Sequence, residues 1–353
     1  MKKQLLSVLL FISIAVVGVC SFGTAIYAEE TEAPKEETEA TKEVEATPAV
    51  PLKVGTELTL GTDSYKVTVE GTQVAYTGTT ASGTIKVPEE IKVDDVSYKV
   101  TSIADGAFKN NTNITAVMIE KNVTTIGKNA FSGCIGLKSA LMEVGVTSIG
   151  IEAFANCSAL TTVTIPKSVT IIRARAFMGC TSLQTASISA GVATIGQGAF
   201  RNCMSLTMIT IPKTVTIVKK NAFNGCVKLG TVNFKAGLLT IGDSAFANCT
   251  ELNTVSIPKS VITIKANAFS GDTELKTVTI GTGLETIGKK AFHGCKNLDI
   301  ITIKSNNLYS VKSNAFLGIQ SEAVIRVKAA MLTEYTKLMK GKGQGKGVSI
   351  VKI

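Results

Sequence analysis

Seven of the eight cysteines recur at one position of a 23-residue period, so thiol chemistry is the first chemistry to consider. A thiol can form a disulfide, bind a metal or act as a nucleophile. In one column of successive repeats, with parallel Cβ vectors, these thiols have poor disulfide geometry, and intervals of 23 residues match no metal-ligand spacing. Asn111, Asp272 and Ile319 fill the same column elsewhere, so no pairing is required. We interpret the cysteines as buried free thiols that fill a core. They are Cys134, Cys157, Cys180, Cys203, Cys226, Cys249 and Cys295.

The single histidine, His293, limits the catalytic and metal chemistry open to the chain. One imidazole cannot form a two-histidine metal site. It occupies a position held elsewhere by Lys109 or Ser132, which predicts a variable surface residue rather than a catalytic one. The segment 341–347 (GKGQGKG) matches neither nucleotide-binding glycine motif and is interpreted as a flexible basic turn. We therefore expect no enzyme, metal or cofactor; a hydrolase with a Ser–Lys pair is a distant alternative.

The elements that would position these residues are predicted by the repeat itself. Phenylalanine recurs every 23 residues from Phe108 to Phe292 and again at Phe316, each time directly after an alanine. A leucine or isoleucine follows six positions later and leads into alternating apolar and polar residues, as in 163–165 (VTI), which is typical of a β-strand. A single repeat buries too little to be stable, whereas stacked repeats share one core. The sequence predicts a solenoid of about ten 23-residue rungs, each with a β-strand and a short helical turn.

The repeat also resembles a known family. The pattern I-P-x-x-V-x-x-I-G-x-x-A-F-x-x-C-x-x-L resembles the BspA-like leucine-rich repeats of bacterial surface proteins. Ile165, Pro166, Val169, Ile172, Ala176, Phe177, Cys180 and Leu183 reproduce it, with Arg173 in place of the glycine. The resemblance covers about residues 100–318. It implies a leucine-rich repeat fold and a secreted or surface-exposed interaction protein, often linked to adhesion, without implying a shared ligand or catalytic residues.

The N-terminal 49 residues are predicted to direct export and to act as a tether. Residues 1–28 have the charged start, apolar middle and small final residue of a signal peptide. Lipid attachment at Cys20 is the disfavoured alternative, because the bulky Val19 precedes it. Residues 29–49 contain eight Glu and no aromatic residue, which predicts a disordered acidic linker. The mature chain is expected to be secreted or at the cell surface, without a membrane span.

Three further segments complete the predicted organisation. Residues 50–103 alternate apolar and polar residues and are predicted to form a small β cap, ahead of a solenoid over 104–321. Residues 322–353 are predicted to form a C-terminal cap. This cap contains a helix over 329–340 and a last strand over 349–353.

Basic residues follow a period of two rungs. The net charge of +10 is the sum of +2 from Lys2 and Lys3, −6 from the linker and +14 from residues 50–353. Four positions before the phenylalanine, glycine alternates with a basic residue: Gly150, Arg173, Gly196, Lys219, Gly242, Lys265, Gly288, Lys312. The Pro-Lys pairs place Lys167, Lys213 and Lys259 on the same alternate rungs. Cations should then recur about 10 Å apart, twice the strand spacing. Two interpretations stay open: a solvated face inherited by duplication, or a stripe for a linear polyanion such as wall teichoic acid or a host glycosaminoglycan.

Outward strand positions are rich in hydroxyl residues, among them Thr162, Thr164, Thr254, Thr277 and Thr279. The chain has no Trp, and its phenylalanines are assigned to the signal segment and the core, which argues against aromatic platforms for sugars or single-stranded nucleic acid. Polar and electrostatic contact remains. We predict a non-enzymatic extracellular binding or adhesion protein that uses this strand face and the basic flank to bind a protein or an anionic polysaccharide or wall polymer, without specific nucleic-acid binding. A structural wall-associated spacer is the alternative.

Overall fold

A computed structural model describes residues 50–353, which belong to one compact unit. The predicted signal peptide (1–28), the acidic linker (29–49) and Cys20 lie outside the described residues.

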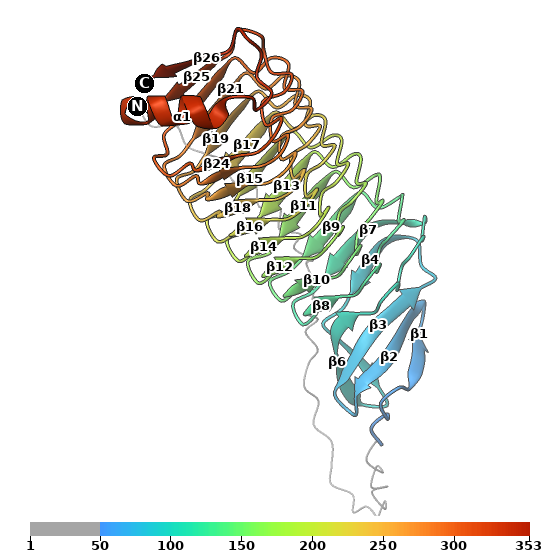
Figure 1. Cartoon of the computed structure of the whole chain (residues 1–353). Helices are drawn as coiled ribbons and strands as arrows, with labels where there is room; N and C mark the ends of the chain where they lie inside the picture. Colours follow the sequence, from blue (N-terminus) through green and yellow to red (C-terminus); the bar gives the residue numbers. More distant parts are fainter. Residues whose placement is uncertain (1–49) are drawn as a thin grey trace, which may run out of the picture. The chain divides into compact units, whose positions relative to one another are not determined.

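Two sheets run through the described part of the chain, and each rung contributes one strand to each of them (Figure 1). The strands of successive rungs pair in parallel and in register; for example, Ile172 pairs with Ile195, and Ile195 with Val218. The long-strand sheet contains β4 (Gly83–Val87), β7 (Ile114–Ile119), β9 (Ser139–Met142), β11 (Thr162–Ile165), β13 (Thr185–Ile188), β15 (Met208–Ile211), β17 (Thr231–Phe234), β19 (Thr254–Ile257), β21 (Thr277–Ile280), β23 (Ile300–Ile303), β25 (Val324–Val327) and β26 (Ser349–Lys352). The short-strand sheet contains the two-residue strands β8 (Thr125–Ile126), β10 (Ser148–Ile149), β12 (Ile171–Ile172), β14 (Thr194–Ile195), β16 (Ile217–Val218), β18 (Thr240–Ile241), β20 (Thr263–Ile264), β22 (Thr286–Ile287) and β24 (Ser310–Val311).

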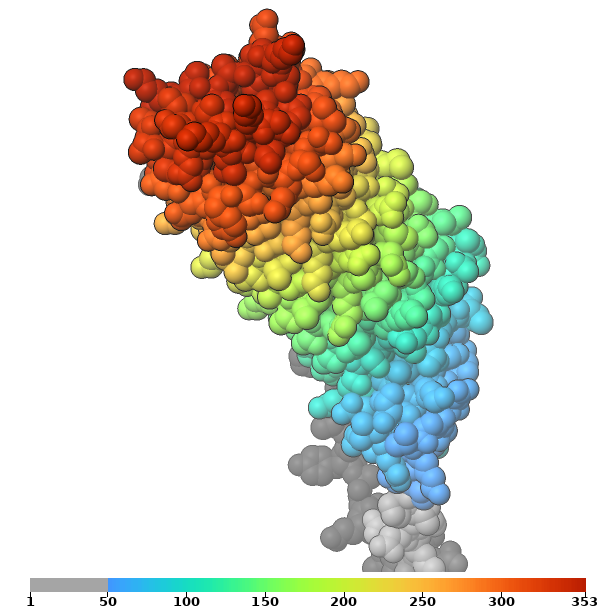
Figure 2. Space-filling model, viewed as in Figure 1, coloured from blue at the N-terminus to red at the C-terminus, as the bar shows by residue number. Residues whose placement is uncertain are grey.

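The predicted solenoid is confirmed, with a correction to the number of rungs. Within residues 50–353 the long-strand sheet has twelve strands rather than about ten. The two additional strands are β4 and β26, which lie at its ends and lack an Ala-Phe pair, so the repeat pattern does not reveal them. Figure 2 shows the same order on the surface, where colours follow one another along the solenoid because each rung contacts its sequence neighbours.

The segment around each Ala-Phe pair is a run of tight turns where a short helical turn was predicted. In the second repeat, Cys134 N–H donates to the Phe131 carbonyl (3.1 Å) and Leu137 N–H to the Cys134 carbonyl (3.1 Å). Phe131 N–H itself donates to the Ala153 carbonyl of the next rung at 2.7 Å. The N–H group of Phe131 therefore donates to the next rung, whereas in an α-helix it would donate to the carbonyl four residues earlier.

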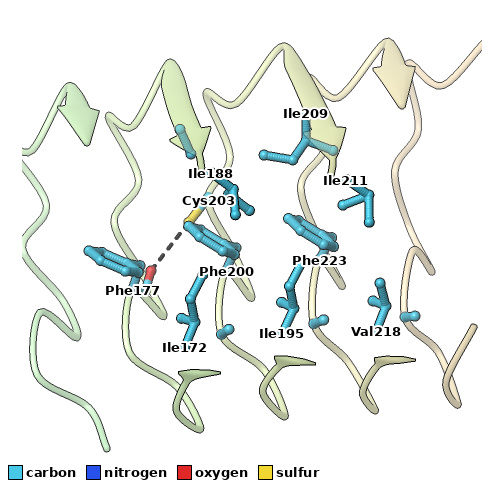
Figure 3. Packing of buried hydrophobic residues seen from close by; sticks show 14 of the residues in the cluster. Ile172, Phe177, Ile188, Ile195, Phe200, Cys203, Ile209, Ile211, Val218 and Phe223 are labelled. Carbon is cyan, nitrogen blue, oxygen red and sulfur yellow. Dashed lines mark hydrogen bonds between the residues drawn. The ribbon is translucent and has the colours of Figure 1, made fainter. Parts of the chain in front are cut away.

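The core lies between the two sheets, and its centre is a column of phenylalanine rings (Figure 3). From Phe108 to Phe316 the centroids of successive rings are 4.7–6.0 Å apart and the planes differ by at most 8°. Figure 3 shows Ile209 and Ile211 of the long-strand sheet on one side of this column, and Ile172, Ile195 and Val218 of the short-strand sheet on the other. The outer faces of the two sheets therefore point in opposite directions.

The N-terminal cap continues both the sheets and the ring column. It contains β1 (Glu57–Leu60), β2 (Asp63–Val69), β3 (Gln73–Thr79), β5 (Glu90–Val93) and β6 (Val96–Ile103). Strand β6 pairs in parallel with β8, and Tyr76 stacks on Phe108 with ring centroids 5.3 Å apart. The cap thus pairs a strand with the first rung and covers the otherwise exposed face of the Phe108 ring.

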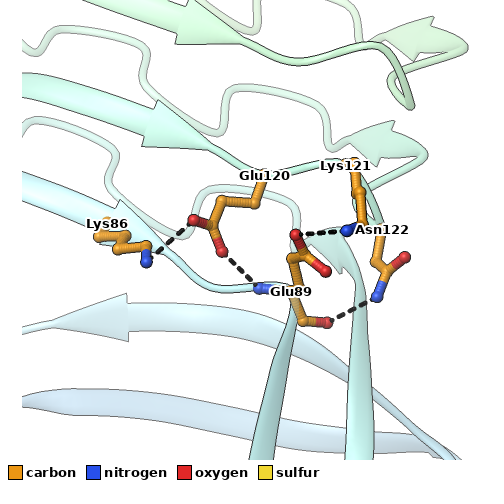
Figure 4. Close-up of polar contacts among 5 residues, drawn as sticks. All are labelled: Lys86, Glu89, Glu120, Lys121 and Asn122. Carbon is orange, nitrogen blue, oxygen red and sulfur yellow. Dashed lines mark hydrogen bonds and ion pairs between the residues drawn. The ribbon is translucent and has the colours of Figure 1, made fainter.

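Two ion pairs join the cap to the first rung (Figure 4). Lys86 Nζ lies 2.9 Å from Glu120 Oε1, and Lys121 Nζ lies 2.9 Å from Glu89 Oε1. Glu120 also accepts the backbone N–H of Glu89 at 2.9 Å, and Asn122 donates to the Glu89 carbonyl. These contacts hold the turn after β4 against the turn after β7.

The C-terminal end of the core is closed by a helix, as predicted from the sequence. A 3-10 turn (η1, Ala329–Met331) leads into α1 (Leu332–Met339), which buries Tyr335 and Met339. The Tyr335 hydroxyl donates to the Ser305 carbonyl at 3.1 Å and accepts the Leu308 N–H at 3.0 Å, so burying it leaves its polar atom satisfied. No helix within residues 50–353 is long and apolar enough to cross a membrane.

Candidate basic binding surface

The structure separates the predicted binding residues into two groups on opposite faces. Thr162, Thr164 and Thr254 are exposed on the outer face of the long-strand sheet, and Thr277 and Thr279 are half-buried there. The six basic residues lie instead in the turns on either side of the short strands. A single small site cannot contain both groups.

The threonines form an interrupted ladder. Thr162 pairs with Thr185, and Thr254 pairs with Thr231 and Thr277. Met208 lies between the two runs, with 53% of its surface exposed, and breaks the row of hydroxyl groups.

The predicted basic residues form two columns that flank the short-strand sheet. Lys167, Lys213 and Lys259 lie in the turns that lead from the long strands to the short strands, and Arg173, Lys219 and Lys265 directly follow the short strands. All six side chains are exposed. Within residues 50–353 none of them forms an ion pair, and Arg173 Nε donates to the Ser148 hydroxyl at 3.2 Å. Their charges are thus available to an anionic ligand.

Two adjoining depressions lie along the second of these columns. One has a volume of about 330 Å³ and lies between Arg173 and Lys219, and the other, of about 310 Å³, lies between Lys219 and Lys265. Lys219 and Gln197 line both. We call this surface the basic trough: the two hollows with the cations Arg173, Lys219 and Lys265.

The trough is hollow because glycine occupies every second rung. Gly196 lines the first depression and Gly242 the second, and both are buried. A Cβ at Gly196 would be 2.5 Å from the carbonyl oxygen of Ile172, so this rung lies too close to its neighbour for a side chain. Long basic side chains on the rungs before and after it then form the walls. The basic residues therefore repeat every two rungs, because the glycine rungs between them have no room for a side chain.

The charge of the trough is mostly positive. The hollow beside Arg173 is lined by Arg173 and Lys219 without an acidic residue. The hollow beside Lys265 is lined by Lys219, Lys220 and Lys265 and by one carboxylate, Asp243. The exposed apolar residues that line the hollows are isoleucines: Ile151 and Ile171 in the first, and Ile217 in the second.

The cysteine column lies in the core, away from this surface. The seven thiols are free and fully buried, and each donates to the phenylalanine carbonyl 26 positions earlier, as Cys203 Sγ does to Phe177 O at 3.2 Å. Burial raises the pKa of the Cys134 and Cys180 thiols to about 12, so the thiolate, the nucleophilic form, is scarce at neutral pH. Asp272 takes the place of a cysteine in this column. Within the described residues no group of three or more His, Cys, Asp and Glu side chains is placed to hold a metal ion.

His293 is half-buried, with Nδ1 3.5 Å from the Ser270 hydroxyl. This distance is at the limit of a hydrogen bond. The basic segment 341–347 follows α1 in a turn region, as expected, and Lys342 N–H in it donates to the Gln344 side chain at 3.0 Å.

Sequence reasoning found the cations of the trough but not its hollows. Gly196, Gly242 and Gln197 were not among the predicted site residues. The alternation of glycine with a basic residue was the available signal, because a glycine that repeats at one position of a solenoid indicates a close approach between rungs.

Comparison with known proteins identifies the family. The family model described as the BspA type leucine rich repeat region matches residues 101–230 and 216–329, with six copies, and so covers more than half of the chain. The chain belongs to the BspA-type leucine-rich repeat family. A search of curated proteins found no match.

Several solved structures are similar to this BspA-type chain. A leucine-rich repeat protein from Bacteroides ovatus is 23% identical with a TM-score of 0.47, covering 84% of this chain and 99% of that one. A leucine-rich cell surface protein from Faecalibacterium prausnitzii is 23% identical with a TM-score of 0.46, covering 85% and 95%. The pneumococcal vaccine antigen PcpA is 18% identical with a TM-score of 0.39, covering 86% and 100%.

Proposed function

We propose that this BspA-type protein is a non-enzymatic binding or adhesion protein, acting outside the cytoplasmic membrane, that holds an anionic polymer on the basic trough. The observation that carries this proposal is the line of exposed, unpaired cations at Arg173, Lys219 and Lys265, set beside hollows with one carboxylate between them. The signal-like residues 1–28 support export.

A linear polymer suits this surface because the cations repeat along the solenoid. In-register pairing of the short strands aligns equivalent residues from rung to rung, so the three cations follow the solenoid axis. Several weak charge contacts on one chain add up to useful affinity, whereas each exposed pair alone contributes about 0.2–1 kcal/mol. Lys167, Lys213 and Lys259 form a second column across the short-strand sheet and would strengthen the field over the same face.

The test is a matched pair of triple variants. Arg173→Gln, Lys219→Gln and Lys265→Gln together should lower affinity for immobilised heparin or purified wall teichoic acid about tenfold or more. The control is Lys138→Gln, Lys228→Gln and Lys276→Gln, which removes the same charge from exposed residues that lead into the long strands. Equal weakening by both variants would show that net charge, not the trough, determines binding. If the native protein binds neither of these polymers nor hyaluronan, the polyanion proposal fails and the spacer function becomes the better explanation.

A further inference from the structure

We infer that the ligand of the basic trough is an acidic glycan that carries one carboxylate or sulfate for every two sugar residues. This inference rests on the proposed function and names the class of polymer. It starts from the period of the trough, which is two rungs and therefore about 10 Å.

Both hollows of the trough offer the same three kinds of contact, and the second adds two side chains of opposite charge, Lys220 and Asp243. A cation ends the period, at Arg173, Lys219 or Lys265. An exposed isoleucine lines the hollow, with 43% of Ile171 and 37% of Ile217 accessible. These are contacts for a charged group and for the apolar C–H face of a sugar ring.

The third contact is polar and neutral. Thr194 and Gln197 line the first hollow, and Thr240 and Gln197 line the second. A hydroxyl and an amide can donate to and accept from sugar hydroxyl groups. A volume of about 310–330 Å³ for each hollow is at the small end for ligand sites. Such a hollow suits a short, neutral unit lying between two charges.

The glycine rungs make the trough a poor match for polymers with more closely spaced charges. No cation is available at Gly196 or Gly242, and steric contact with the preceding rung keeps both positions without a side chain. A nucleic-acid strand, with a phosphate every few ångströms, or a polyol-phosphate chain would place uncompensated charges over these rungs. In the hollow beside Lys265 such a charge would also meet Asp243. A glycan with a neutral sugar between charged ones avoids both conflicts.

The first experiment measures affinity as a function of length. The probes are hyaluronan oligosaccharides, which carry one carboxylate per disaccharide, of four, six and ten sugars. Affinity should rise about fivefold from four to six sugars, when a third carboxylate reaches the third cation, and rise by a smaller factor from six to ten, when a further carboxylate reaches Lys312, which follows β24 in the same column. A comparison series of polygalacturonate oligosaccharides, with a carboxylate on every sugar, should bind more weakly at equal total charge. Equal or tighter binding of polygalacturonate would overturn the inference.

The second experiment places a negative charge in the hollows without touching a glycine. Gln197 is exposed and lines both hollows, so Gln197→Glu should lower hyaluronan hexasaccharide affinity roughly three- to tenfold through repulsion. Gln184→Glu is the matched control, because Gln184 is exposed and directly precedes β13 of the opposite sheet. Circular dichroism and the thermal midpoint confirm that both variants fold.

The outcomes separate the two proposals. If the triple trough variant loses polyanion binding while Gln197→Glu behaves like Gln184→Glu, the trough binds anions but the acidic-glycan inference is wrong. If the triple trough variant binds as well as the native protein, the proposed function itself fails.

Discussion

Gly242 lies so close to Val218 of the preceding rung that a Cβ at residue 242 would stand 2.6 Å from the Val218 carbonyl oxygen. Gly196 has the same relationship to Ile172, and Gly288 lies against the backbone of Lys265. One rung before each of these glycines the chain carries a basic residue: Arg173, Lys219 and Lys265. The relationship therefore links the packing of the backbone to the spacing of the surface charge.

Replacement of Gly242 by alanine should destabilise the solenoid. The new methyl group must displace the backbone of Val218 or Lys219, and overpacking of this kind costs about 1–3 kcal/mol. Urea denaturation measures the free energy of unfolding. Gly230→Ala is the control, because its Cβ would meet atoms at 3.7 Å or more, and it should be nearly neutral. Equal losses in the two variants would contradict the close approach.

The seven column thiols should resist modification in the native state. They are buried, and burial raises the pKa of Cys134 and Cys180 to about 12, so a thiol reagent at pH 8 should react at the rate of unfolding. Reducing agent should leave the thermal midpoint unchanged, since the thiols are free. Labelling of any of the seven within seconds, or a reductant-induced fall of many degrees, would be inconsistent with this structure.

Asp272 should make stability depend on pH in an unusual direction. It is fully buried, and burial raises its pKa well above the ordinary value of an aspartate carboxyl group. Its Oδ1 accepts the Cys249 N–H at 2.9 Å, whereas Oδ2 has no partner within the described residues. Because the folded state binds this proton more tightly than the unfolded state, the stability associated with it is present below about pH 4. It is lost as the pH rises through the folded pKa.

The variant Asp272→Cys restores the column residue and should raise the free energy of unfolding at pH 7 by about 1–3 kcal/mol. Its advantage over the native protein should shrink as the pH is lowered toward 4, as measured by denaturant titrations across that range. An advantage that grows on acidification would show that Asp272 is more stable in its charged form in the folded protein.

The cap junction should depend more on Glu120 than on Lys86. Glu120 accepts both Lys86 Nζ and the Glu89 backbone N–H, while Lys86 makes the ion pair from a more exposed position. Truncation of Glu120 to alanine leaves a backbone donor without its acceptor and should lower the urea midpoint more than Lys86→Ala. The pKa of Glu120 is lowered, first by its hydrogen bond to Lys86, so this contribution should fade as the pH falls through that pKa. The reverse order of the two variants would mean that the backbone bond is unimportant.

The fold could be predicted from the sequence because several positions of the 23-residue repeat carry the same type of residue in each rung. The same period of 23 residues separates the equivalents of Phe131, of Cys134 and of Leu137. Such a period predicts that successive repeats stack, even when the backbone angles are unknown. A strand near β26 was predicted over 349–353, and β4 falls in the predicted β cap, but the place of both strands in the long-strand sheet was not predicted because no Ala-Phe pair marks a rung there.

The positions of the predicted binding residues on the surface were harder to predict from the sequence. Thr164 and Lys167 are three residues apart, yet Thr164 lies on the long-strand face and Lys167 in the turn that leads to the opposite sheet. Residue spacing does not state how sharply the chain turns between β11 and β12. The hollow above Gly196 likewise depends on the distance between two backbones, which the residue types alone do not report.

The salt dependence of polyanion binding shows whether the cations of the basic trough hold the polymer. With three cations of the basic trough in contact, the logarithm of the association constant for heparin should fall with the logarithm of salt concentration with a slope of about −2. In Arg173→Gln, Lys219→Gln, Lys265→Gln the slope should approach zero, whereas the Lys138, Lys228, Lys276 control should keep the native slope. A native affinity that does not change between 50 and 300 mM salt, or a trough variant with an unchanged slope, would show that the trough cations do not bind the polymer.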